Sequence, residues 1–306
     1  MSTERGDGVL FLVGTPIGNL EDMTIRGVRV LREEAEIIAA EDTRRTRALC
    51  SHFGIHKRVV SYHEHNEESA ARRIVKMLKE GRKVALVSDA GMPGLSDPGC
   101  RLVTRCLEEG IRVVPVPGPS AAVTALVVSG LCKNRFIFEG FLPRERGKRL
   151  ETLKSFAADP RPVVVYESPR RVGRTLQDIA ETLGPRTVVV AREMTKVYEE
   201  IIRAPAAEAA RIVGASPRGE FTVVIAGADA ERQPPGKRAA EGSERGPVGV
   251  GSNDIAGDVE NLVSSGVPRM DAIKRVARTR GLTKRQAYSL LAGRSEGPPA
   301  EGDGSE

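Results

Sequence analysis

The chain has 306 residues, a formal net charge of +6 from 47 basic and 41 acidic side chains, and 40% hydrophobic residues. This length can bury a full core in two or three units, and the composition is ordinary for a soluble globular protein. No run approaches the roughly 18 apolar residues of a membrane span, and the first residues lack the apolar core of a signal peptide, which predicts a cytoplasmic protein without membrane contact.

Strands and helices alternate over the first 130 residues. Short runs rich in valine, isoleucine and alanine predict strands at 9–13, 37–40, 59–62, 84–87 and 111–116. The segments between them have helical apolar spacing, and Ile25, Val28 and Leu31 fall on one face in this way. The alternation predicts a largely parallel sheet with helices on both faces.

Capping signals predict where helices begin in this part of the chain. Asn66 precedes two glutamates and can cap a helix that follows it. Asp97 is a suitable N-cap for a helix with Pro98 at its first position. We therefore predict helices that begin at these two caps, and a small apolar helix over 120–130.

The pattern changes near residue 135. Further strands are predicted at 136–138, 163–166, 187–191, 200–203 and 221–226, with a helix at 172–183 and a basic loop at 143–149. We interpret this as a second α/β lobe. The first lobe then spans 8–120 and the second spans 121–227.

The C-terminal part has a different composition. Residues 228–252 are rich in Gly, Pro, Ala and charge, which predicts a flexible linker. Residues 253–295 contain eight basic and four acidic side chains and predict short helices at 255–264, 269–280 and 283–291. They are typical of a helix-turn-helix unit, although a generic three-helix mini-domain fits equally well. The positive charge suggests a polyanionic partner such as RNA, or simply a solvated helix face.

No metal site is expected from the cysteine and histidine pattern. The cysteines are Cys50, Cys100, Cys106 and Cys132, and none has CxxC spacing. We interpret them as reduced, packed thiols. His63 and His65 flank Glu64, but without further ligands such a pair is more often polar loop chemistry than a metal site.

Five loops rich in glycine, proline and polar residues leave the predicted strands. They are GTPIGNL at 14–20, EDTRRTR at 41–47, YHEHN at 62–66, SDAGMPGLSDPG at 88–99 and VPGPSAA at 116–122. Each alone is explained as an ordinary strand-to-helix connection. Because the carboxyl ends of parallel strands share one edge, the loops together favour a single ligand pocket there.

Eight motifs of the chain are similar to those of a known family. GTPIGNLEDMT, AAEDTRRT, SYHEHNE, VSDAGMPGLSDPG, VPVPGPSA, FEGFLPR, YESPRR and AREMTKVYEE occur in this order within residues 8–227. They resemble the tetrapyrrole methylase superfamily, and within it the branch that methylates the 2′-oxygen of a cytidine ribose in bacterial small-subunit (16S) ribosomal RNA. The combination of EDTR with SDAG and DPG is specific, whereas PGPSA is shared with the tetrapyrrole branch. The chain departs from the family at 92–95, where it has Met-Pro-Gly-Leu in place of Thr-Pro-x-Ile and so lacks a threonine hydroxyl.

The resemblance implies an α/β fold of two lobes with a trough between them for the methyl donor S-adenosylmethionine (SAM), plus a small C-terminal helical domain. It also implies a homodimer, no metal, and the small ribosomal subunit or its rRNA as partner. Carried over position by position, the implied SAM-binding residues are Asp89, Ala90, Gly91, Ser120, Ala121, Leu142, Tyr166, Glu193, Gly219 and Glu220. SAM needs backbone polar groups, a carboxylate near its positive end and an apolar slot, and these residue types suit those needs.

Methyl transfer to a ribose hydroxyl requires aligned reactants, exclusion of water and, where it helps, a group that takes up the hydroxyl proton. The candidate proton acceptors, which the sequence does not rank, are Glu41, Asp42, His63 and Glu193. The candidates for binding RNA phosphates are Arg44, Arg45 and Arg47, because guanidinium forks fit phosphate oxygens. Two other interpretations stay open: a tetrapyrrole (precorrin-type) carbon methyltransferase of the same fold, and a non-catalytic RNA-binding protein.

Overall fold

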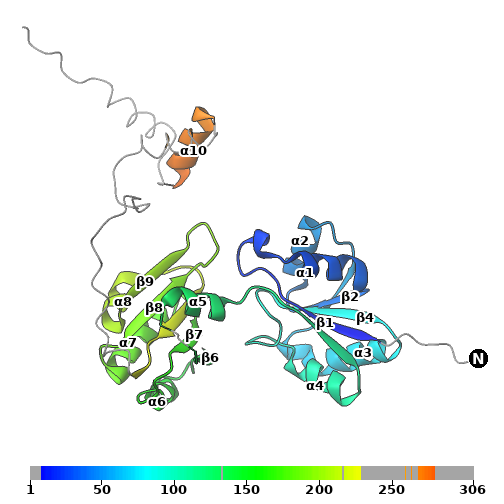
Figure 1. Ribbon diagram of the computed structural model, residues 1–306, viewed down its shortest axis with the longest axis horizontal. Helices are drawn as coiled ribbons and strands as arrows, with labels where there is room; N and C mark the ends of the chain where they lie inside the picture. Colours follow the sequence, from blue (N-terminus) through cyan, green and yellow to red (C-terminus); the bar gives the residue numbers. More distant parts are fainter. Residues whose placement is uncertain are drawn as a thin grey trace, which may run out of the picture. The chain divides into compact units, whose positions relative to one another are not determined.

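The computed structural model describes residues 8–131, 134–215, 217–228, 259, 263 and 268–279, and this part of the chain contains two five-stranded sheets. The first sheet has the order β3-β2-β4-β1-β5, and all of its strands are parallel. Its strands are β1 (Val9–Val13), β2 (Ile37–Ala40), β3 (Arg58–Ser61), β4 (Lys83–Val87) and β5 (Arg112–Val116). The parallel sheet predicted from the alternation is therefore confirmed (Figure 1).

Helices cover both faces of this sheet because its strands carry apolar side chains on both faces. On one face lie α1 (Ile25–Arg29), the π-helical turn η2 (Val30–Glu34) and α2 (Thr43–His52), and on the other lie α3 (Glu67–Lys79) and α4 (Cys100–Glu108) (Figure 1). Neighbouring residues of β1 enter different cores: Phe11 joins the α1 and α2 side and Leu10 joins the α3 and α4 side. Burial of both faces stabilises the sheet and leaves its strand ends to the loops.

The second sheet is mixed and has the order β6-β7-β10-β8-β9. Its strands are β6 (Ile137–Phe141), β7 (Val163–Glu167), β8 (Thr187–Arg192), β9 (Glu200–Pro205) and β10 (Phe221–Ile225). β6 runs parallel to β7, whereas β10 is antiparallel to both β7 and β8. Phe221, the first residue of β10, therefore pairs with Glu167 and Arg192 at the ends of its neighbours. This register places residues 219–222 at the sheet edge where β7 and β8 end.

Helices also cover both faces of the second sheet. α6 (Arg146–Ser155), α7 (Val172–Leu183) and α8 (Ala206–Val213) pack on one face, and α5 (Ala121–Ser129) packs on the other. α5 follows the last strand of the first sheet, yet its apolar residues join the core of the second sheet. Ile17, from the loop after β1, enters the same cluster and links the two lobes.

One of the two predicted helix starts is wrong. α4 begins at Cys100 after Gly99, whose φ of +148° favours glycine, so that Asp97 belongs to the preceding loop. The start predicted at Asn66 is confirmed, since Asn66 is the N-cap residue of α3, but its side chain accepts a hydrogen bond from the backbone N–H of His63 (2.9 Å) and makes no cap bond to the helix. A capping preference is a local rule, and in both segments the path of the loop outweighs it.

Two helices were not predicted. The segment expected to form a basic loop at 143–149 enters α6 at Arg146, and the alanine-rich α8 lies where no element was assigned. The first segment is highly charged and shows no clear apolar periodicity, because only two side chains of α6, Arg149 and Leu153, are buried. In α8 the alanines alone were the available signal for a helix.

The second compact unit of the chain spans residues 238–306, and its described part contains α10 (Arg269–Thr279). This helix lies where the sequence predicts one over 269–280. The predicted linker 228–252, apart from Ala228, and the predicted helix 283–291 lie outside the described residues, as does 255–264 except for two helical valines at 259 and 263. Among the helices that the structure describes, none is long and apolar enough to cross a lipid bilayer.

Candidate active site

A cavity of about 440 Å³ lies where loops of the two lobes meet. The first lobe lines it with residues that follow β1, β2, β4 and β5, and the second lobe with residues at the ends of β6, β7 and β8 and at the start of β10. The sequence candidates that line it are Glu41, Arg45, Asp89, Ala90, Gly91, Ser120, Ala121, Tyr166, Gly219 and Glu220. Loops that are far apart in the sequence thus form one site.

Three first-lobe loops are joined through their backbones beneath this cavity. Thr15 and Gly91 exchange two backbone hydrogen bonds, of 2.9 and 3.0 Å, and the Thr15 hydroxyl donates to the carbonyl of Ser88 (3.1 Å). Gly14 and Gly118 are in backbone contact, since a Cβ at Gly118 would lie 2.7 Å from the Cα of Gly14. The two glycines therefore allow a close approach that any side chain would prevent.

The second lobe contacts these loops through Lys196. A Cβ at Gly18 would lie 2.5 Å from the side chain of Lys196, so the lysine stem packs directly over this glycine. The Lys196 ammonium forms ion pairs with Glu193 and Glu220, both at 2.9 Å. Gly219 has a φ of +97°, and a Cβ there would strike the Glu193 carboxylate. These contacts fix the wall that Gly219 and Glu220 present to the cavity.

One wall of the cavity is acidic and contains Glu41, Asp89 and Asp97. Asp89 accepts the backbone N–H of Asp42 (3.0 Å) and forms an ion pair with Arg45 (3.3 Å). Burial raises the pKa of Glu41, and the negative charge of Asp89 raises it further. Burial, together with the Glu41 carboxylate, raises the pKa of Asp97 to about 6. Three carboxylates facing one cavity with a single paired arginine form a site that favours a cation.

Replacing Asp97 with asparagine is expected to stabilise the protein at pH 7. In the folded state Asp97 keeps its proton up to about pH 6, whereas its ordinary pKa is 3.8. The folded state therefore binds more protons in this interval, so the stability of the wild type falls as pH rises from about 4 to 6. The Asp97→Asn variant lacks this loss, so its advantage should be present at pH 7 and vanish near pH 4.

Urea unfolding of both proteins at pH 4, 5, 6 and 7 measures this difference. The exposed Asp271 on α10 provides a matched control, because Asp271→Asn removes the same charge outside the cavity. A wild type that is as stable as Asp97→Asn at pH 7 would contradict the expectation.

Another part of the cavity lining is aromatic and apolar. Tyr166 lies edge-on to Phe138 and Phe141, with ring centroids 5.2 and 5.7 Å apart. Burial raises the pKa of the Tyr166 hydroxyl, which keeps it neutral. Ile17 and Met194 complete this side of the lining. A lining with an acidic part and an aromatic part suits a molecule with a cationic part and a flat ring.

Several sequence candidates lie outside the cavity lining. Leu142 is 2% exposed and belongs to the core between the second sheet and its helices. The Glu193 carboxylate is engaged by Lys196 and by the backbone N–H of Glu220 (2.9 Å). The hydrogen bond from Lys196 lowers the pKa of Glu193, which makes it a weak proton acceptor. Glu193 therefore supports the cavity wall through Glu220, whereas Leu142 packs in the core.

The three candidate RNA arginines lie in different surroundings. Arg45 lines the cavity through its ion pair with Asp89. Arg44 forms an ion pair with Asp42 (3.1 Å), which caps α2, and the guanidinium beside it lowers the pKa of Asp42 to about 2. Arg47 donates to the hydroxyl of Thr43 (3.2 Å). Arg44 and Arg47 remain exposed on the helix that begins beside the cavity.

The histidine pair lies outside the cavity lining, with ring centroids of His63 and His65 5.9 Å apart. Among the described residues there is no group of three or more side chains that could hold a metal ion. Cys50, Cys100 and Cys106 are free thiols, and Cys132 lies outside the described residues.

Sequence reasoning missed part of the lining. Asp97 lines the cavity, although the sequence pattern predicts a helix cap there. Its position in the SDAGMPGLSDPG loop was the signal that could have identified it as a site residue. Phe141, Glu167 and Thr222 line the cavity from the second lobe. They stand at strand ends that only the mixed sheet order brings together, so no local pattern identifies them.

Comparison with known proteins gives consistent results. The model of the tetrapyrrole (corrin/porphyrin) methylases matches residues 9–210. A protein named ribosomal RNA small subunit methyltransferase I from Halalkalibacterium halodurans is 44% identical over 94% of this chain and 96% of its own length. One of the same name from Thermotoga maritima is 51% identical over 72% of this chain and 99% of its own length.

A similar solved structure shares the fold. It is the uroporphyrin-III C-methyl transferase from Thermus thermophilus complexed with S-adenyl homocysteine, with a TM-score of 0.50 and 21% identity. The match covers 71% of this chain and 97% of that chain. At this identity the likeness shows the two-lobed fold alone.

Proposed function

We propose, since the chain belongs to the tetrapyrrole (corrin/porphyrin) methylase family, that it transfers a methyl group from SAM to the 2′-oxygen of a cytidine ribose in small-subunit ribosomal RNA. The observation that carries the proposal is the 44% identity with the Halalkalibacterium protein along nearly the full length of both chains. A small-molecule methyltransferase has no need of the basic unit at 253–295, whereas an RNA substrate does.

The residues of the cavity fit SAM. When bound, SAM supplies a methyl group attached to a positively charged sulfur. The carboxylates of Asp89 and Asp97 would complement its positive charges, and the Tyr166 side of the cavity would receive an apolar ring. Gly91, with a φ of +81°, shapes the same wall through its two backbone hydrogen bonds to Thr15. The protein thereby orients the donor and excludes water from the acceptor oxygen.

Glu41 is the proposed proton acceptor. Of the four sequence candidates, all of which the structure describes, Glu41 alone lines the cavity. Its raised pKa, which burial causes, makes its carboxylate a stronger base than an exposed glutamate. In this role Glu41 removes the proton from the ribose hydroxyl as that oxygen attacks.

Basic side chains outside the cavity would bind the RNA on either side of the methylated nucleotide. Arg44 and Arg47 on α2 are proposed phosphate contacts, whereas Arg45 serves the cavity through Asp89. We propose the domain division 8–120 and 121–227 for the two lobes, with the linker 228–252 leading to a helix-turn-helix-like unit at 253–295 that adds RNA affinity.

Assembly and location follow from the same proposal. A ribosomal substrate implies a cytoplasmic protein. A homodimer is supported by α5, which is mostly apolar but leaves Val123 and Val127 49% and 74% exposed. A helix of this kind is typically buried, and a second copy of the chain would cover it.

Donor-dependent methylation of unmodified small ribosomal subunits tests the function. Purified protein is incubated with the subunits and with SAM carrying a labelled methyl group, and the modified nucleotide is then mapped. We expect label on the 2′-oxygen of a cytidine ribose, and no label when the protein is omitted.

Other outcomes would contradict this function. Labelling of a tetrapyrrole but not of the subunits or of naked ribosomal RNA would identify a carbon methyltransferase. RNA binding without SAM binding or label transfer would identify a non-catalytic RNA-binding protein.

A further inference from the structure

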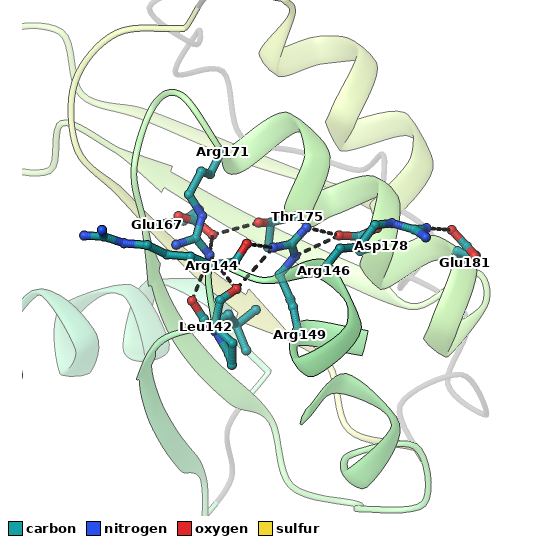
Figure 2. Close-up of polar contacts among 10 residues, drawn as sticks. Leu142, Arg144, Arg146, Arg149, Glu167, Arg171, Thr175, Asp178 and Glu181 are labelled. Atoms are coloured by element: carbon teal, nitrogen blue, oxygen red, sulfur yellow. Dashed lines mark hydrogen bonds and ion pairs between the residues drawn. The ribbon is translucent and has the colours of Figure 1, made fainter. Parts of the chain in front are cut away.

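Two loops of the second lobe border the cavity and are tied to each other by arginine side chains. One loop, at 142–145, follows the cavity residue Phe141, and the other, at 168–171, begins with the cavity residues Ser168 and Pro169. Figure 2 shows the polar network that connects them with α6 and α7. Both loops carry arginines that the proposed methyl transfer has not used.

Arg149 fixes the first loop from below. Its side chain is 7% exposed and forms an ion pair with Asp178 on α7 (2.7 Å), whose side chain is 6% exposed. Another nitrogen of the same guanidinium, Nη1, donates to the carbonyls of both Pro143 (3.1 Å) and Arg144 (3.0 Å). This planar fork holds two successive carbonyls of the loop in a fixed position.

Arg171 joins the second loop to the first. Its guanidinium donates to the carbonyls of Leu142 (2.8 Å) and Pro143 (3.2 Å). It also forms an ion pair with the fully buried carboxylate of Glu167 (3.1 Å), which in turn accepts the hydroxyl of Thr175 (2.7 Å). Because Glu167 also lines the cavity, the network connects the loops directly to the cavity wall.

Two other arginines of these loops face outward. The Arg144 and Arg170 side chains are exposed, and no hydrogen bond or ion pair joins either of them to another residue in the described part of the chain. Figure 2 shows the Arg144 side chain extending away from the network that holds its own carbonyl. Two unpaired guanidinium groups therefore stand on rigid backbone beside the cavity.

We propose that Arg144 and Arg170 form an arginine rim that binds RNA phosphates next to the methylated nucleotide, with Arg149 and Arg171 as its positioning residues. This inference rests on the proposed function, because it assigns the surface on which that substrate lies. A guanidinium matches the oxygens of a phosphate, and a rigid backbone lowers the entropy lost on binding. Phosphates held beside the cavity would set which nucleotide reaches it.

The Arg144→Ala/Arg170→Ala double variant tests the rim. Methylation kinetics on unmodified small subunits are expected to show a KM for subunits raised roughly tenfold or more. The Kd for SAM, measured by calorimetry, should stay within about twofold, because both side chains lie outside the cavity lining. Direct binding of subunits at several salt concentrations should show the slope of log K against log salt reduced by about 1.4 to 1.8, for two lost phosphate contacts.

Arg73→Ala/Arg211→Ala is the matched control. These arginines, on α3 and α8, are also exposed and outside the cavity lining, and their loss changes the net charge by the same amount. The control should keep the wild-type KM and salt slope. This result would show that the loss in the rim variant depends on the positions of its two arginines and not on the net charge alone.

The possible failures are distinguishable. Unchanged subunit binding and salt slope in the rim variant would overturn the rim, whether or not the wild type methylates. A matching loss in the control pair would also overturn it. A large loss of SAM affinity would place these arginines in the donor site instead. A wild type that binds subunits through the rim but transfers no methyl group would overturn the proposed function and not the rim.

Discussion

Replacing Gly118 with alanine is expected to weaken SAM binding by roughly tenfold or more, since overpacking costs about 1–3 kcal/mol and is relieved here by moving loops of the site. The new Cβ would lie 2.7 Å from the Cα of Gly14 and 2.8 Å from its carbonyl carbon. Carbon atoms prefer separations of about 3.5–4.0 Å. Backbone atoms cannot rotate away as a flexible side chain does, so the loops after β1 and β5 must separate.

That separation would disturb the bonds between Thr15 and Gly91, and hence the cavity wall. The measurement is the Kd for SAM by calorimetry, with circular dichroism to establish that the variant is folded. Gly147→Ala is the matched control, because Gly147 lies in α6 with nothing within 4 Å of the added Cβ. A Gly118→Ala protein that binds SAM as tightly as the control would show that the contact between the loops does not shape the site.

Replacing Asp178 with alanine is expected to lower the free energy of unfolding by about 3–5 kcal/mol, because it leaves a buried charge without its partner. Asp178 and Arg149 form the most buried ion pair of the second-lobe network, with side chains 6% and 7% exposed. Asp178 also accepts a hydrogen bond from Arg146 (3.0 Å). Urea unfolding measures the loss.

Glu181→Ala provides the control, since Glu181 pairs with the same Arg146 (2.6 Å) but is 63% exposed. Its loss should cost less than about 1 kcal/mol, as for other surface ion pairs. The double variant Arg149→Met/Asp178→Leu should recover most of the stability, because it removes both buried charges together. Equal costs for Asp178→Ala and Glu181→Ala would show that burial does not govern this pair.

The first lobe could be predicted closely because its signals are local. All five strands were found within two residues of their ends, since apolar runs between Gly- and Pro-rich loops mark buried parallel strands. The sequence also predicts that the loops at 14–20, 88–99 and 116–122 meet in one site, because parallel strands present their carboxyl ends at one edge of the sheet.

The function of single carboxylates was less predictable. Glu41, Asp97 and Glu193 all have the chemistry of a proton acceptor, and the chain order does not separate them. The folded chain does: Lys196 and the backbone of Glu220 engage Glu193, whereas Glu41 and Asp97 face the cavity. The residues that surround these carboxylates come from loops of both lobes. The contacts that distinguish the carboxylates therefore form only when both sheets have folded.

The parallel first sheet, the second α/β lobe and the loops that meet at a ligand site could therefore be predicted from the amino-acid sequence, because periodicity and strand order act through neighbouring residues. Which of several identical side chains is buried and which is exposed depends on how the folded chain packs. Arg144 and Arg149 are five residues apart and chemically equal, yet one faces solvent and the other pairs with Asp178. The difference arises because burial of a charge depends on the opposite charge supplied by another helix, and no local pattern contains that information.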